Sequence, residues 1–383
     1  MAVPAFWSNQ FGINIKSVGV PTGADEVMIA QGSLEEACCV AVYGKNARLV
    51  AAVNQKEVEW ISRRHARATA QVAAARCRRA TMAQDTTIQP GSTPRPSSGV
   101  TSLQLGTFGA WFNPVYEDAV RVRFVVEAEA LGYTTAWLSM GYDSVADLEV
   151  VEQALDATTT INVATAVVNV WTNDATTVGR SYQRIVAKHP NRFLLGVGVG
   201  HPEQIGTYRS PLETLASYLD LLDANGVPRE RRVLAALGPR ALRLAAERAA
   251  GTHPYLVVPD FTRHARAIIG PEALLAPEHM AVVSTDATRA RAIGRAFVVE
   301  KAYLRLSNYV NNLLRHGFTA DDVRGGGGDR LIDALVLHGD PAQISAGLSA
   351  HLDAGANHVS VQVLVAPGDD PMPGYRALAR TLV

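Results

Sequence analysis

Three glycines at every second position are the first residues whose spacing suggests chemistry. Gly196, Gly198 and Gly200 share one side of a buried apolar run, and His201 follows them directly. A strand face without side chains lets another group approach closely, so we expect a bound ring or phosphate near Gly198 and Gly200. Tight packing of the sheet is the alternative at Gly196. His201 is the candidate acid or base, because the pKa of histidine lies near neutrality, with loop capping or phosphate contact as its alternative.

A second candidate is the glycine turn that opens a helix. An apolar run ends at Leu237, Gly238 makes the turn, and Pro239 fits the first helical position, where its missing N–H costs no hydrogen bond. The free N–H groups of that turn, with the Arg240 guanidinium beside them, would attract a phosphate. An ordinary junction with a solvated arginine is the alternative. Gly251 lies in another small-residue turn before the next strand, and the two turns together would form a phosphate-tail site.

These residues must be positioned by elements that alternate between strand and helix after about residue 100. Each apolar, β-branched run is followed by an Ala/Leu/Arg-rich segment of helical period. A parallel arrangement follows, because parallel neighbours require a crossover connection. Eight such units predict a closed (β/α)8 TIM barrel, with an open doubly wound sheet as the alternative. The expected strands are 103–111, 134–139, 161–170, 193–199, 232–237, 255–258, 280–284 and 358–365.

Two tryptophans and a histidine fall near the predicted ends of these strands. Trp111 and Trp137 close strands one and two, where they line a substrate pocket or fill the barrel. His253 precedes the sixth predicted strand, where it either donates to a phosphate tail or packs in the interior. Chemistry on such a barrel belongs at the C-terminal ends of the strands.

The first hundred residues have a different pattern. Residues 1–61 offer short strand-like stretches at 26–30, 38–43 and 49–53, separated by turn signals, and predict a small α+β fragment. Residues 62–99 begin as an arginine-rich helix and continue as a Pro/Ser/Thr-rich linker that we expect to be disordered. The predicted domains are therefore 1–61, 62–99 and 100–383.

The composition excludes several classes of function. The sequence has 36 basic residues (Lys and Arg) and 36 acidic residues (Asp and Glu), so it has no net positive charge to attract nucleic acid. The sequence contains no apolar run of about 18 residues, so it predicts no membrane span. The three cysteines have neither metal-ligand nor disulfide spacing, which indicates a reducing, cytoplasmic location and no metal site.

Six stretches taken in order resemble the luciferase-like flavin monooxygenase superfamily, and within it the oxidoreductases that use the deazaflavin coenzyme F420. The resemblance covers about residues 103–383. The stretches are 196–203, 234–240, 246–255, 275–278, 327–335 and 351–359.

The resemblance implies an enzyme that transfers a hydride between coenzyme F420 and a small organic substrate at the barrel mouth. It also implies a homodimer, with 308–312 in the interface, and a kinked third strand beneath the ring. The implied ring positions are Thr165, Ala166, Gly198, Gly200 and His201. The implied tail positions are Ala236, Gly238, Pro239 and Arg240, with Gly251 nearby. An FMN-dependent monooxygenase is the alternative within the same superfamily.

Two features depart from that pattern. The deazaflavin sugar-phosphate dehydrogenases of the superfamily carry an Asp-His pair after strand two, where this chain has Trp137-Leu138-Ser139-Met140-Gly141-Tyr142. Residues 3–61 resemble the C-terminal domain of flavin-containing ferredoxin reductases, but no Gly-x-Gly-x-x-Gly unit accompanies them. An inactive fusion product is therefore a third hypothesis.

Overall fold

The chain divides into two units, residues 1–97 and 98–383, and each is described by itself. The structure is a computed structural model, and it describes 103–383 except 142–144, 146 and 201–209, together with five strands among the first 55 residues. His201 and the expected helix and linker at 62–99 therefore lie outside the described residues.

In the N-terminal unit, five strands form an antiparallel sheet in the order β1-β2-β5-β4-β3. The strands expected at 26–30, 38–43 and 49–53 fall within β3, β4 and β5. Two further strands precede them. The five strands are β1 (Ala5–Gln10), β2 (Ile13–Gly19), β3 (Glu26–Ser33), β4 (Cys38–Lys45) and β5 (Arg48–Gln55).

The second unit is built on a curled sheet of eleven strands, all paired in parallel. Ten of them follow the path β13-β12-β11-β10-β8-β7-β6-β16-β14-β15, and β9 pairs with β10 off this path. Two pairs, β8 with β9 and β13 with β14, are each one barrel strand with a break, which leaves eight barrel strands and β15. The strands are β6 (Phe108–Phe112), β7 (Thr135–Leu138), β8 (Asn162–Thr165), β9 (Val168–Asn169), β10 (Phe193–Gly198), β11 (Arg232–Leu234), β12 (Gly251–Thr252), β13 (Leu274–Leu275), β14 (Glu278–Val283), β15 (Val336–Gly339) and β16 (Val359–Val363).

The ring closes where β13 runs into β14. The two strands are separated only by Ala276 and Pro277, and the segment is bonded on both sides: the Glu278 N–H donates to the Pro254 carbonyl at 3.0 Å, and the Ser360 N–H donates to the Pro277 carbonyl at 3.0 Å. The predicted (β/α)8 barrel is confirmed. On its other side, β14 also pairs in parallel with β15, which lies outside the ring.

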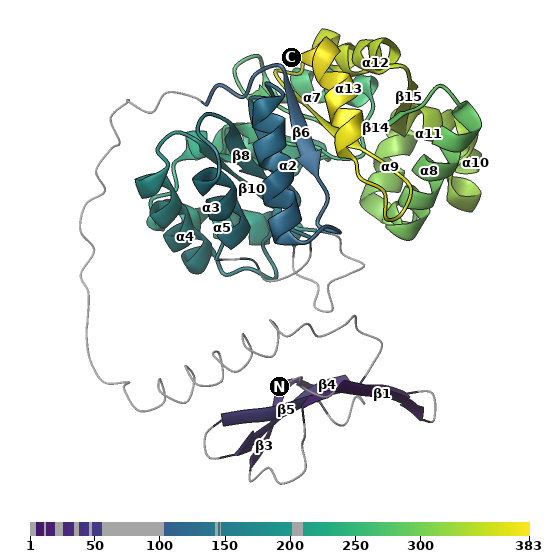
Figure 1. Ribbon diagram of the computed structural model, residues 1–383. Helices are drawn as coiled ribbons and strands as arrows, with labels where there is room; N and C mark the ends of the chain where they lie inside the picture. The colour runs from purple at the N-terminus through teal and green to yellow at the C-terminus, as the bar shows by residue number, and fades with distance from the viewer. Residues whose placement is uncertain are drawn as a thin grey trace. The chain divides into compact units, whose positions relative to one another are not determined.

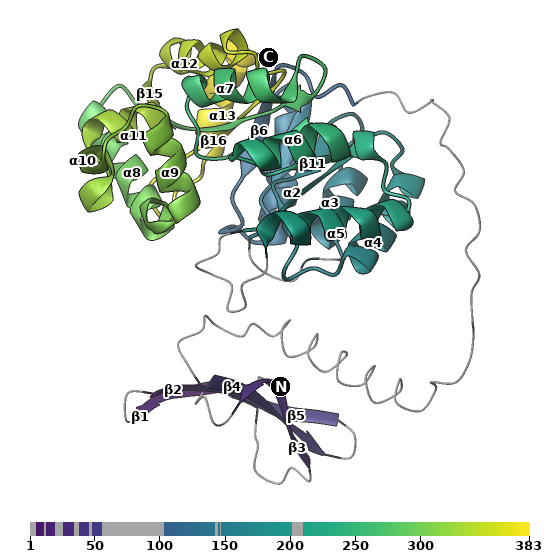
Figure 2. The same cartoon turned by 180° about the vertical axis from the view of Figure 1, so that it is seen from behind.

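Helices cover the outside of the sheet, as α2, α3 and α5 do in Figure 1 and α6 and α7 in Figure 2. Capping residues mark the starts of two of them, 175–188 and 211–224. Asp174 accepts a hydrogen bond from the Thr177 N–H, and Ser210 accepts one from the Glu213 N–H. The helices are α2 (Asp118–Ala130), α3 (Glu149–Asp156), α4 (Ala175–Lys188), α5 (Pro211–Ala224), α6 (Pro239–Arg248), α7 (Pro259–Ile269), α8 (Ala287–Glu300), α9 (Ser307–Arg315), α10 (Ala320–Val323), α11 (Asp329–Leu335), α12 (Pro341–Asp353) and α13 (Met372–Leu382), with 3-10 helices η2 (Arg229–Arg231), η3 (Tyr303–Arg305) and η4 (Arg324–Gly326).

The sixth strand was predicted at the wrong place. Residues 255–258 were expected to form it, but β12 is Gly251–Thr252, and Leu256 has a positive φ of 58°. The run is apolar because Leu256 and Val258 are buried in a second hydrophobic cluster, which joins β14 and β15 to α8, α9 and α11. Figures 1 and 2 both show these helices gathered around β15, away from α3–α5.

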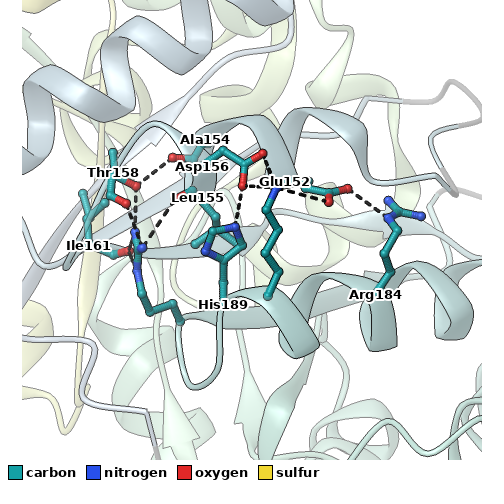
Figure 3. A network of polar contacts seen from close by, with 10 residues as sticks. Glu152, Ala154, Leu155, Asp156, Thr158, Ile161, Arg184 and His189 are labelled. Carbon is teal, nitrogen blue, oxygen red and sulfur yellow. Dashed lines mark hydrogen bonds and ion pairs between the residues drawn. The ribbon is translucent and has the colours of Figure 1, made fainter.

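At the N-terminal ends of the barrel strands, ion pairs and hydrogen bonds between charged residues connect α3 to α4 (Figure 3). The Asp156 carboxylate lies 2.6 Å from both the Lys188 ammonium and the His189 imidazole, and Arg184 donates to Glu152 at 2.9 Å. These pairs are satisfied within the protein. This end of the barrel therefore carries structural polar contacts, and the candidate chemistry lies at the other end.

Candidate active site

The third barrel strand is broken at the C-terminal edge of the sheet. β8 ends at Thr165 and β9 begins at Val168, and the Ala166–Val167 peptide bond between them is cis. Ala166 and Val167 are partly exposed, whereas the strands on either side of them are buried. This break corresponds to the kinked third strand that the resemblance implies. It presents a short apolar ledge at the barrel mouth.

The Thr165 side chain holds this break in place. It is buried, and its hydroxyl accepts a hydrogen bond from the Gly196 N–H at 2.8 Å and donates to the Gly196 carbonyl at 2.9 Å. The hydroxyl thus takes the place of a backbone group in the ladder between β8 and β10. A ligand on the ledge would meet Ala166 before the Thr165 side chain.

Protein atoms explain the alternating glycines of β10. A Cβ on Gly196 would lie 2.0 Å from the Thr165 carbonyl oxygen, and one on Gly198 would lie 2.8 Å from Val167 Cγ2 and 3.0 Å from the Ala235 Cβ. Packing therefore requires glycine at both positions. The expected contact between Gly198 and a ring stays a prediction.

Gly200 makes the turn at the end of β10. Its φ of +62° is one that glycine adopts without strain, and a Cβ there would meet the Asn169 amide nitrogen at 3.0 Å. His201 follows it outside the described residues, so its role as acid or base stays a prediction.

The first turn of α6 is the best anion site among the described residues at this edge. Gly238 is the N-cap, Pro239 occupies the first helical position, and nothing lies within 4 Å of a Cβ built on Gly238. The Arg240 side chain is exposed, and no hydrogen bond or ion pair to it is found within the described part of the chain. The open turn, the helix dipole and a free guanidinium together fit a phosphate.

Two of the expected tail positions lie elsewhere. The Ala236 side chain is buried in the cluster between sheet and helices, so only its backbone faces the mouth. Gly251 lies within β12, level with Val233, and its Cβ would lie 1.9 Å from the Leu274 carbonyl oxygen. Gly251 therefore allows two strands to approach, well below the Gly238 turn, and its expected role near the tail has no support from this placement.

Below the mouth, the barrel interior holds neutral aromatic and imidazole groups. The Trp137 indole N–H donates to His358 Nε2 at 2.9 Å, and His358 Nδ1 lies 2.8 Å from the Gly106 carbonyl oxygen. His253 Nδ1 lies 2.7 Å from the Ala276 carbonyl oxygen. Burial lowers the pKa of His253 to about 3 and that of His358 to about 4. His253 therefore has a packing role, the second of its two predicted alternatives.

Two groups near the mouth, Tyr255 and Gln362, were not predicted. Tyr255 donates its hydroxyl hydrogen to Gln362 Oε1 at 3.0 Å, and its own oxygen accepts from the Tyr303 hydroxyl at 3.2 Å. Burial raises the pKa of Tyr255 well above its usual value. A signal was present in β16, where polar Ser360 and Gln362 alternate with valines and so share the inward face.

Glu278 is the third missed group. Its side chain is buried in the same part of the interior, and neither carboxyl oxygen has a hydrogen-bond partner among the described residues. Burial raises its pKa well above the usual range, and the nearby Leu256 backbone N–H opposes this only in part, so the protonated carboxyl is favoured. Within the described ranges no group of three or more potential ligands could hold a metal ion, and no helix is long and apolar enough to cross a membrane.

Solved structures share this fold. An F420-dependent secondary alcohol dehydrogenase in complex with an F420-acetone adduct superposes with a TM-score of 0.56 at 13% identity, over 74% of this chain and 98% of its own. A coenzyme F420-dependent tetrahydromethanopterin reductase from Methanopyrus kandleri gives 0.54 at 15% identity, over 74% and 99%. The oxygenating constituent of 3,6-diketocamphane monooxygenase from the CAM plasmid of Pseudomonas putida, in complex with FMN, gives 0.54 at 14% identity, over 72% and 96%.

Family comparisons assign both parts of the sequence. Residues 5–85 match the reductase C-terminal family, in agreement with the resemblance of the first 61 residues. No curated protein matches the chain. Residues 105–358, which include the barrel strands β6–β15, the broken third strand and the α6 turn, match the family of luciferase-like monooxygenases. The chain therefore belongs to the luciferase-like monooxygenase family.

Proposed function

We propose that this protein is an oxidoreductase that transfers a hydride between coenzyme F420 and a small organic substrate at the mouth of the barrel. The observation that supports it most is the pairing of an apolar ledge at Ala166 and Val167 with an open helix N-terminus at Gly238 and Arg240. A deazaflavin has the same two parts, a flat apolar ring and an anionic tail. Both sites lie beyond the C-terminal ends of barrel strands, β8 and β11, which flank β10 on its two sides.

The residues present fit such a group. The open space beside Gly238 and the free Arg240 side chain would hold the phosphate, and Ala166 and Val167 would support one face of the ring. A bound deazaflavin or flavin supplies two-electron transfer as hydride. Below, the Trp137 indole stacked on His253 helps to keep water from the lower face of the site.

His201 is proposed to hold or release the proton that accompanies the hydride. It directly follows Gly200, whose turn lies at the C-terminal end of β10. An imidazole there suits proton transfer near neutral pH. The chain has no histidine in the segment 137–142 after strand two, so His201 would take over that task.

An FMN-dependent monooxygenase is the second candidate. A solved structure with this fold contains FMN, and the ledge and the α6 turn would accept an isoalloxazine ring and a phosphate equally well. Both cofactors combine a tricyclic ring of similar size with an anionic tail. Measured cofactor binding is therefore what separates the two candidates.

The test is a fluorescence titration of the full chain with coenzyme F420 and, separately, with FMN. Micromolar binding of F420 without binding of FMN supports hydride transfer to or from a deazaflavin. The reverse result supports the monooxygenase. If neither cofactor binds, the proposal is wrong and the inactive fusion product is favoured.

A further inference from the structure

The three tryptophans of the described barrel differ in what their indole N–H groups do. Trp137 donates to His358 at 2.9 Å, and Trp171 donates to the Val199 carbonyl at 2.6 Å. The Trp111 indole nitrogen is buried without a partner among the described residues. An indole N–H can only donate, so a buried one without an acceptor costs about 1–3 kcal/mol. The side chain is only 4% exposed, so solvent does not offset that cost.

A second unpartnered donor lies beside it. The Nε2 group of Gln362 is buried, with a side chain only 2% exposed, and it has no partner in the part of the chain that the structure describes. The other end of this amide is fixed, because Oε1 accepts from the Tyr255 hydroxyl, which in turn accepts from Tyr303. The two tyrosines thereby hold the amide in the orientation that keeps its NH2 group free.

The two donors lie next to each other at the C-terminal edge. β16 and β6 are paired with Val361 opposite Ala110, so Gln362 is level with Trp111 on the neighbouring strand. Trp111 belongs to the interior cluster, whereas Ala110 and Val361 belong to the outer one, so both donors face inward. The Tyr255 ring contacts both: its centroid lies 5.7 Å from that of Trp111, and its hydroxyl binds Gln362.

We propose that Trp111 and Gln362 form a two-donor site for the carbonyl oxygen of the substrate, with Tyr255 and Tyr303 as positioning residues. This inference rests on the proposed function and names its substrate class, a ketone or aldehyde and the corresponding alcohol. Two neutral donors select an uncharged oxygen that accepts hydrogen bonds.

The site also suits the chemical step. When a carbonyl carbon accepts a hydride, the π electron pair moves onto the oxygen, which then takes one proton to give the alcohol. Donors that already point at this oxygen stabilise the charge as it develops. The hydride comes from the reduced deazaflavin of the proposed function, and the proton comes from the acid at the mouth.

The direct test observes the indole N–H groups by 15N–1H correlation spectroscopy of the full chain, with and without F420. Single Trp→Phe variants assign the five indole signals, and if Trp111→Phe does not fold, the other four assign it by elimination. Cyclohexanone is the probe, and cyclohexane is the matched control without an oxygen. We expect the Trp111 signal to move downfield with cyclohexanone alone, while Trp137 and Trp171 stay in place. An unmoved Trp111 signal overturns the proposal.

Kinetics of cyclohexanone reduction separate the donors from the cofactor site. Trp111→Phe and Gln362→Met should each lower kcat/KM about tenfold or more, with an unchanged Kd for F420. Tyr255→Phe should lower kcat/KM by a smaller factor. It keeps the aromatic ring and the Gln362 NH2 group and removes only the hydroxyl that orients the Gln362 amide. Wild-type kcat/KM in Gln362→Met would overturn the proposal.

Failure of this inference is distinguishable from failure of the proposed function. If F420 binds and Trp111 does not respond to cyclohexanone, the donor site is wrong and hydride transfer stands. If F420 does not bind and the Trp111 signal still moves, the donor site stands and the cofactor assignment is wrong.

Discussion

The indole of Trp137 lies flat against the imidazole of His253, with ring centroids 3.9 Å apart and planes 9° from parallel. Both side chains are buried in the barrel interior, directly below the mouth. The stack is neutral, because burial lowers the pKa of His253 to about 3. A neutral, closely packed layer thus separates the candidate active site from the charged N-terminal face.

Buried histidines make the barrel sensitive to acid. Burial lowers the pKa of His253 to about 3 and those of His279 and His358 to about 4, whereas unfolded histidine titrates near 6.5. The stability that these groups contribute is therefore complete above about pH 6.5 and is lost as the pH falls toward 4. Each of these histidines lowers the free energy of unfolding by about 1.4 kcal/mol for each pH unit in that window. Urea unfolding at pH 7 and pH 5 measures this, and equal free energies of unfolding would contradict it.

Glu278 should have the opposite pH dependence. Its folded pKa is raised well above the unfolded value, so the stability of the native state falls as the pH rises above about 4.3. Glu278→Gln removes this loss, so we expect it to raise the free energy of unfolding at pH 8 and to have little effect at pH 4. Urea unfolding of both proteins at the two pH values gives the difference. A destabilised variant at pH 8 would show that the ionised carboxylate has a partner.

Glu129 provides the matched control with the other sign. Burial alone would raise its pKa, but N–H groups of Thr160, Ile161 and Thr159 donate to the carboxylate and lower it to about 2. Its contribution is present above about pH 4.5 and lost as the pH falls toward 2. Glu129→Gln should therefore destabilise the barrel by about 2 kcal/mol at pH 7. An unchanged free energy of unfolding at that pH would refute it.

Replacing Arg240 tests the anion site without affecting the core. The side chain is exposed and has no partner among the described residues, so Arg240→Ala should leave the Tm unchanged and weaken cofactor binding about tenfold, measured by fluorescence titration. Arg289→Ala is the control, because that arginine is also exposed in a first helical turn, but Asp286 already caps the turn. Equal affinity in the two variants would remove Arg240 from the site.

Gly198 and Gly238 make a second matched pair. A Cβ on Gly198 meets Val167 and Ala235, so Gly198→Ala should displace the ledge, lower stability by about 1–3 kcal/mol and weaken ring binding. Gly238→Ala meets no atom within 4 Å and should cost less than about 1 kcal/mol. Thermal unfolding and cofactor titration report on both. Wild-type stability in Gly198→Ala would mean that the neighbouring strands yield easily.

Local signals in the sequence determined the alternation of strands and helices, and from it the parallel barrel. Caps and amphipathic periods act within a few residues, as at the starts of helices 175–188 and 211–224. The short β12, the added β15 and the C-terminal α13 were not predicted. These elements depend on which strands pair. An apolar run such as 255–258 does not by itself determine whether it lies in a sheet or in a side cluster.

The identity of close neighbours was decided only by the tertiary structure. The spacing of Gly196 and Gly198 predicted that something approaches β10, but only the register with β8 and β11 places Thr165, Val167 and Ala235 there. Tyr255 and Gln362 lie 107 residues apart, and no local pattern joins them. Side-chain periodicity is a property of one segment, whereas contacts across a barrel depend on how several segments align.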